Sequence, residues 1–335
     1  MGYYSRGGPV IFRGMRPEDV DACVALIPEA FKANDMVRAA LPVLWRQLLR
    51  DDALHGGVVV DATLSPSIVA FGLTTFVNDD FVSEYLAAPR PYLSAIVYER
   101  ALAGRSPILS EQDLRQGNSA GTLNFVILHF GLGLRLSTAA AMAAVGAAEV
   151  GFRLRHTGYR VRRVLQEAYG AEEVRMLESA GMQLKSDYAA FYAEHSCEEP
   201  PVAEHPYLMG LTADDPQSQR PGTAAAAVFQ YAEPRFFFSP AEQRVLALAV
   251  LDQSDEEIAA EIGGSRAGIK KIWRRAYQRV ADVEPDLLVA SDDDDRAIRG
   301  KEKRRNLIRY LRYHLEELRP LARRRHSPRR SRART

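Results

Sequence analysis

Cysteine and long apolar runs are both scarce in this sequence of 335 residues. Two cysteines, Cys23 and Cys197, are too few for a disulfide framework, and we expect no signal peptide. The Ala-rich stretch at 138–150 is shorter than the roughly 18 apolar residues of a membrane helix and contains Gly146 and Glu149. We therefore expect a cytoplasmic protein without a membrane partner.

The sequence also lacks the residue patterns of common catalytic and metal sites. It contains no Ser-His-Asp spacing, no phosphate-binding P-loop and no cluster of metal-ligating side chains. His129 lies in an apolar strand, which favours a hydrogen-bonded core histidine over a general base. His156 lies among arginines, which favours the protein surface. We expect no catalytic residue and no metal.

Charge is balanced over the whole chain but not along it. The net charge is +1, yet residues 296–335 hold 16 Lys and Arg against 3 Glu, which leaves −12 for residues 1–295. A basic block of this size is typical of segments that bind polyanions. The alternative for the last dozen residues is a disordered, solvated tail, which can also lie on phosphates.

The pattern of residues divides the chain into four segments. Residues 1–192 alternate strand-like and helix-like runs, and residues 193–237 are rich in Pro, Glu, Asp and Gln and are typical of a linker. A short strand at 207–211 could still join the first domain. Residues 238–289 are helical, and residues 290–335 comprise an acidic linker, a basic helix and a basic tail.

Residues 238–281 carry the clearest helix boundaries. Two capping boxes, Ser239 with Glu242 and Ser254 with Glu257, open two successive helices. The glycine pair at 263–264 ends the second helix, because glycine readily adopts the left-handed conformation of a helix terminus. A third helix follows at once, and the segment therefore predicts three short helices.

The third helix, which begins after Ser265, has one apolar and one basic side. Its predicted buried stripe is Ile269, Ile272, Ala276 and Val280. No acidic residue lies between positions 265 and 281, and the remaining faces carry Arg266, Lys270, Lys271, Arg274, Arg275 and Arg279. Such a helix suits the major groove, where Lys and Arg contact phosphates and guanine edges. The alternative is a small helical hairpin with a solvated basic face.

These residues resemble the LuxR-type (FixJ/NarL-type) helix-turn-helix without a gap. The matching positions are Pro240, Glu242, Val245-Leu246, Glu257-Ile258-Ala259, Gly263, Ser265 and Ile269-Lys270. The resemblance implies double-stranded DNA as partner, a homodimer, and base contacts from Lys270, Lys271 and Arg274. The chain departs from the family at Asp252, Gly264 and Gly268, where Gly, an aliphatic residue and Thr are usual.

The resemblance also implies a fourth, dimerising helix, for which residues 301–318 are the candidate. Its apolar stripe is Leu307, Leu311, Leu315 and Leu318. That stripe could pack on the helix-turn-helix or on a second protomer, and the sequence leaves both open. We expect the arginines of this helix to face outward and contact the phosphate backbone: Arg304, Arg305, Arg309 and Arg312.

Residues 10–192 resemble the GNAT acetyltransferase fold in the order of their elements. Two short patterns accompany this order, Arg-x-x-x-Pro-Glu-Asp from Arg13 and Leu177-Glu-Ser-Ala-Gly181-Met. The predicted fold class is therefore α+β, a mixed sheet with flanking helices, followed by an all-α helix-turn-helix domain. Leu123–Phe130 is the expected central strand, because it is continuously apolar.

The acetyl-CoA loop of the GNAT family has only a partial counterpart. Gly131 and Gly133 lie about where that family cradles the pyrophosphate, but Leu128 stands where an Arg or Gln is usual. The two glycines are better interpreted as turn residues, and we expect no cofactor. The predicted function is a DNA-binding transcriptional regulator whose non-catalytic GNAT-like domain senses a small-molecule effector. The alternatives are an acetyl-CoA-dependent N-acetyltransferase with a DNA-binding module, and a protein-binding helical module.

Overall fold

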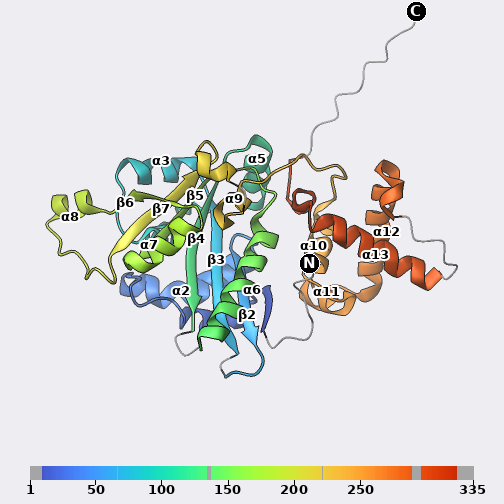
Figure 1. Ribbon diagram of the computed structural model, residues 1–335, viewed down its shortest axis with the longest axis horizontal. Helices are drawn as coiled ribbons and strands as arrows, with labels where there is room; N and C mark the ends of the chain where they lie inside the picture. Colours follow the sequence, from blue (N-terminus) through green and yellow to red (C-terminus); the bar gives the residue numbers. More distant parts are fainter. Residues whose placement is uncertain (1–9, 66, 134–136, 221, 289–295, 323–335) are drawn as a thin grey trace, which may run out of the picture.

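The computed structural model describes residues 10–65, 67–133, 137–220, 222–288 and 296–322 (Figure 1). They form two bodies that lie side by side. The sheet body consists of a β-sheet with helices on both faces, and the helical body is built from the C-terminal helices. Within the described ranges, no helix has the length and apolarity needed to cross a bilayer.

Seven strands form one sheet in the order β1-β2-β3-β4-β5-β7-β6. Their bounds are β1 Val10–Gly14, β2 His55–Asp61, β3 Ile68–Val77, β4 Leu123–Leu132, β5 Val161–Tyr169, β6 Gln183–Ser186 and β7 Pro206–Thr212. β4 and β5 pair in parallel, while the other described pairs are antiparallel. The parallel pair needs a crossover, which helix α6 (Thr138–His156) provides. The sheet is mixed, as predicted.

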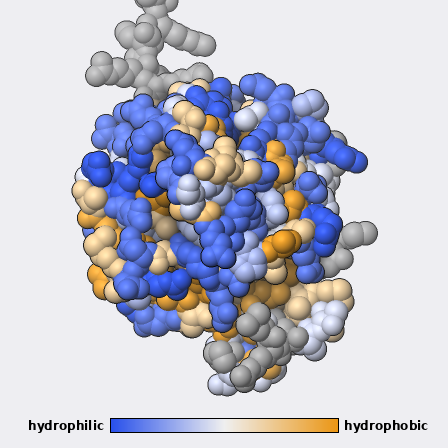
Figure 2. All heavy atoms as spheres, turned by 90° about the vertical axis from the view of Figure 1, so that its left-hand side faces the viewer, coloured by the Kyte–Doolittle hydropathy of each residue, from blue (hydrophilic) through white to orange (hydrophobic). Residues whose placement is uncertain are grey.

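Helices cover both faces of this sheet. One face packs against α1 (Val20–Val24), α2 (Asp35–Arg50), α3 (Asp79–Ala87), α4 (Leu93–Leu102) and α8 (Ala189–His195). The other face packs against α5 (Glu111–Ala120), α6, α7 (Gly170–Ser179) and α9 (Ala224–Val228). On the side turned away from the helical body, hydrophilic residues predominate and hydrophobic ones are interspersed (Figure 2).

One short helix and one expectation for this body need comment. Helix α1 ends at Val24, because Pro28 has no N–H for a further helical hydrogen bond. The segment 193–237 is not a linker throughout, since the strand considered at 207–211 does join the first domain as β7, which pairs with both β5 and β6. It also contains α9, whose residues are buried against the sheet body. The first body therefore extends well beyond residue 192.

The helical body contains α10 (Pro240–Val250), α11 (Asp255–Glu261), α12 (Arg266–Val283) and α13 (Arg296–Leu311). Two 3-10 turns, η3 (Pro285–Leu288) and η4 (Leu315–Leu318), follow α12 and α13. The helix expected over 301–318 is thus a helix and a separate turn. Its leucines at 307, 311, 315 and 318 are buried in the same core as α10, α11 and α12, so the stripe packs on its own chain. The acidic run at 292–295 and the tail from 323 lie outside the described residues.

Candidate functional site

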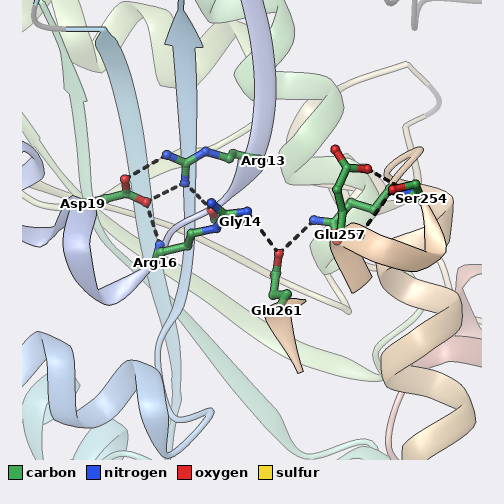
Figure 3. Close-up of polar contacts among 8 residues, drawn as sticks. Arg13, Gly14, Arg16, Asp19, Ser254, Glu257 and Glu261 are labelled. Atoms are coloured by element: carbon green, nitrogen blue, oxygen red, sulfur yellow. Dashed lines mark hydrogen bonds and ion pairs between the residues drawn. The ribbon is translucent and has the colours of Figure 1, made fainter. Parts of the chain in front are cut away.

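The three helices before α13 begin where the sequence predicts. The Ser239 N–H donates to Glu242 at 2.7 Å, which completes the first capping box. The Ser254 N–H donates to Glu257 at 2.7 Å and completes the second (Figure 3). Gly263 adopts a left-handed φ of 67° at the turn between α11 and α12. The Ser265 hydroxyl then accepts from the Gly268 N–H at 3.1 Å. Local capping therefore fixes the direction of α12.

Helix α12 separates its apolar and basic side chains. Ile269, Ala276 and Val280 are buried as predicted, together with Trp273, which the predicted stripe omits. Lys270, Lys271, Arg274 and Arg275 are exposed and are called the basic face below. Among the residues that the structure describes, none of these four has an ion-pair partner. Figure 1 shows α12 on the side of the helical body away from the sheet.

The other predicted DNA-contacting arginines are placed differently. Arg266 is exposed beside the basic face, with its Nε 2.9 Å from Glu256. Arg305 is exposed and lies 3.6 Å from Glu302. Arg304 is not an outward phosphate contact: its guanidinium lies 2.6 Å from Asp255 and 4.8 Å from the Trp273 ring centroid. It holds α13 against α11 and α12 instead.

Arg312 likewise faces inward rather than outward. Its Nη2 lies 2.7 Å from Asp252, a residue with a left-handed φ of 62°. The resemblance drawn from the sequence expects glycine at position 252, and the backbone there adopts a conformation that glycine favours. The chain thus keeps the turn with a non-glycine residue and bonds its carboxylate to α13. Of the four arginines expected outward on this helix, Arg305 and Arg309 are exposed.

One contact between the sheet body and the helical body is made by α11. Glu261 on α11 lies 3.7 Å from the Arg16 guanidinium and accepts from the Gln253 amide at 3.0 Å (Figure 3). Arg16 follows β1, where the Arg13 guanidinium bonds Asp19 through both of its terminal nitrogens, at 2.6 and 2.8 Å. The contact joins the edge of the sheet to the helix that precedes α12.

A second candidate site is a cavity of about 440 Å³ in the sheet body, called the front cavity below. It lies between α6 and strands β2 to β5 and is closed further by α7 and α9. Most of its lining is apolar. The polar side chains that line it include His55, Thr74, Arg155, His156 and Gln166.

His156 is buried in the wall of this cavity, contrary to its expected place on the surface. Its Nδ1 lies 2.9 Å from the Phe152 carbonyl, and its Nε2 lies 2.9 Å from the Thr74 hydroxyl. Burial lowers its pKa well below the usual value, and nearby His55 and Arg155 lower it further. The neutral ring therefore donates from Nδ1 to the carbonyl and accepts from Thr74 at Nε2.

His129 is a core residue, as the sequence predicts, but the expected hydrogen bond is not found at Nε2. That atom is buried and has no partner among the described residues. The ring packs against Phe31, Trp45 and Tyr98, with centroids 4.8, 5.5 and 5.8 Å away. Burial among these rings lowers the pKa of His129 to about 3. The surroundings favour a structural role for this side chain.

The described part of the Gly131–Gly133 segment belongs to the sheet. Gly131 pairs with Phe71, and a Cβ added to Gly131 would lie 2.3 Å from that ring and 2.4 Å from the Leu26 carbonyl. The Gly133 N–H donates to the Val69 carbonyl at 2.8 Å. A pyrophosphate cradle needs N–H groups that point at the ligand. These two glycines therefore do not fit a coenzyme A cradle.

Glu167 on β5 was not among the site residues predicted from the sequence. Its buried carboxylate accepts from the N–H groups of Tyr92 and Leu93 at 2.6 and 3.2 Å, at the start of α4. The hydroxyls of Tyr188 and Tyr169 donate to it at 2.8 and 3.0 Å. Burial raises the pKa of Glu167 to about 7, against the effect of these four donors. A glutamate in the interior of a strand that also holds Val161, Val164 and Leu165 was the sequence signal that could have revealed it.

Comparisons with known proteins give matches among solved structures alone. No family model matches the sequence, and no curated protein matches it. The chain is similar to a mosquito arylalkylamine N-acetyltransferase-like protein (10% identity, TM-score 0.38), over 61% of this chain and 99% of that one. It is also similar to a Drosophila melanogaster polyamine N-acetyltransferase (13%, TM-score 0.36), over 61% and 99%. A third is Arabidopsis thaliana NAA60 in complex with acetyl-CoA (12%, TM-score 0.36), over 62% and 99%.

Proposed function

We propose that this chain is a cytoplasmic, sequence-specific DNA-binding regulator that inserts α12 into the major groove. The observation that carries the proposal is the basic face, four exposed cations without ion-pair partners among the described residues. Their side chains project from a helix that is anchored by four buried residues, Ile269, Trp273, Ala276 and Val280. A rigid helix with one cationic side is suited to both phosphate contacts and base readout.

The sheet body is, in this proposal, a non-catalytic GNAT-like domain that senses a small molecule. The poor fit of Gly131 and Gly133 to a coenzyme cradle supports a role other than acetyl transfer. The homodimer implied by the LuxR-type resemblance would use a surface other than the leucine stripe of α13 and η4, because those leucines are already buried. The alternative function is an N-acetyltransferase that carries a DNA-binding module.

The test is selection of duplexes from a random library by the full-length protein, followed by footprinting on the enriched site. A variant with both Lys270→Ala and Arg274→Ala should lose the preference for that site, at about 1–3 kcal/mol for each base contact. The matched control carries Arg50→Ala and Arg105→Ala, two exposed arginines on the sheet body, and should keep it. Equal footprints for wild type and the Lys270/Arg274 variant would contradict the assignment. Acetylation of an amine by wild type would favour the alternative.

A further inference from the structure

Basic groups gather at one end of the front cavity. Arg155, His55 and His156 all line it there, and the Arg155 guanidinium donates to the Gly56 carbonyl. Arg155 forms no ion pair with a carboxylate among the residues that the structure describes. Burial, with Arg155 and Arg319 nearby, lowers the pKa of His55 to about 3, so the histidine adds no positive charge at neutral pH. Of the two guanidinium groups here, Arg155 lines the cavity, whereas Arg319 lies outside the lining and donates to the Thr157 and Leu154 carbonyls.

The acidic groups around Arg155 do not neutralise it directly. Glu261 of α11 comes close from the helical body, because its side chain and that of Arg155 both lie next to Gly14. A Cβ added to Gly14 would be 3.0 Å from Arg155 Nη2 and 3.7 Å from Glu261 Oε1. Glu261 is itself engaged by Arg16 and Gln253. Glu149 is exposed where α6 borders the cavity. A guanidinium drawn from water without a bound anion is unfavourable, and this arrangement favours an oxyanion from outside the chain.

The remainder of the cavity lining determines which chemical group is attached to such an anion. Ile127, Phe152, Val164 and Met182, which belong to the core on this face of the sheet, present apolar surface to the cavity. A volume of about 440 Å³ lies within the range of roughly 300–1,000 Å³ for sites that bind small molecules. Ala148 on α6 faces this space, and its small side chain keeps the helix from filling it.

We propose that the front cavity binds an organic monocarboxylate with an apolar body. The carboxylate bonds the Arg155 guanidinium, and the apolar body lies between the sheet and α6. Because Arg155 also lies near Glu261, a bound carboxylate weakens the attraction between α6 and α11. We expect this weakening to change the affinity of α12 for DNA. The effect on DNA affinity rests on the proposed function, whereas binding of the ligand does not.

Calorimetric titration of the full-length protein with decanoate, 1-decanol and decylamine tests the site. Wild type is expected to bind one decanoate per chain, roughly tenfold more tightly than 1-decanol, with decylamine weakest. Arg155→Gln should remove the advantage of decanoate over 1-decanol. The matched control is Arg153→Gln, an exposed arginine on the same helix, which should behave as wild type. Ala148→Phe should abolish binding of both decanoate and 1-decanol by filling the cavity.

Two outcomes overturn the site, and neither depends on the variants folding. One is no binding of decanoate to wild type, and the other is equal affinity for decanoate and 1-decanol. Acetyl-CoA is titrated in parallel, and competition of decanoate with it would place both in the same space. DNA affinity is measured separately, with and without saturating decanoate. An unchanged DNA affinity overturns the link through Glu261, and absence of DNA binding overturns the proposed function, while the calorimetry decides the site.

Discussion

The guanidinium of Arg319 donates to the Thr157 carbonyl at the C-terminal end of α6, with an Nε–O distance of 2.8 Å. Its Nη2 donates to the Leu154 carbonyl at 2.6 Å, and its cation lies 4.9 Å from the Tyr159 ring centroid. The last carbonyls of a helix lack partners within the helix and carry its negative dipole end. Arg319 follows η4, so a residue of the helical body caps the helix that lines the front cavity.

Replacing Arg319 with leucine should therefore destabilise the junction between the two bodies. Arg319→Leu leaves two partly buried carbonyls without this donor and removes a buried side chain from the junction, and we expect a loss of about 2–3 kcal/mol in the free energy of unfolding. Chemical denaturation followed by circular dichroism measures it. Arg309→Leu removes an exposed arginine from α13 and should change stability by less than about 0.5 kcal/mol. Equal denaturation midpoints for Arg319→Leu and Arg309→Leu would show that the cap contributes nothing.

Asp255 should matter more for stability than its acidic neighbour on α11. Its Oδ1 accepts from the Trp273 indole N–H at 3.1 Å and lies 2.6 Å from Arg304. Asp255→Ala leaves both donors without this partner, and we expect a loss of about 2–3 kcal/mol and a shift in Trp273 fluorescence. Glu256→Ala breaks an exposed pair with Arg266 and should cost at most about 1 kcal/mol. Matching losses in the two variants would contradict the inward placement of Arg304.

Features set by neighbours in the sequence were predicted well. Both capping boxes, the glycine turn at 263 and the strand expected over 123–130 depend on residues a few positions apart, and the structure has them where expected. A capping box needs just two side chains three residues apart, so its geometry depends on a short stretch of sequence. The same holds for the apolar stripe of α12, although Trp273 was missed between its neighbours.

Features set by distant residues were not predictable in this way. In the sequence, Arg304 lies in a run of basic residues and is typical of a solvated arginine. Its inward position depends on Asp255, which is 49 positions earlier in the sequence and bonds its guanidinium. Glu167 bonds the start of α4 across 75 positions, and His156 bonds Thr74 across 82. The helices α3, α4 and α5 lie in residues 79–120, for which no element is predicted from the sequence. In α4 the apolar residues cover most sides of the helix, so they do not form the single stripe that marks an amphipathic helix.

The stability of the protein should fall in acid partly through His129. Its folded pKa is about 3, below the unfolded value near 6.5, so the unfolded chain binds a proton that the folded one does not. This contribution is present above pH 6.5 and is lost at about 1.36 kcal/mol per pH unit as the pH falls toward 3. Between pH 7 and pH 5, the free energy of unfolding of His129→Leu should thus fall by about 2 kcal/mol less than that of wild type. Urea denaturation at both pH values measures the difference, and equal losses would refute it.

Removing residues 323–335 should weaken DNA binding without changing its sequence preference. The segment holds seven arginines, and cutting after Ala322 keeps the bonds of Ala322 to Ser119 and of Pro320 to Asn118. The plot of log affinity against log salt has a negative slope. For every phosphate that the shortened chain no longer neutralises, this slope should become shallower by about 0.9, since fewer counterions are released. Anisotropy titrations at several salt concentrations, on the selected duplex and a scrambled one, measure both quantities. Because Lys270 and Arg274 are retained, the ratio of the two affinities should stay constant, and a collapse of that ratio would assign base readout to the tail rather than to α12.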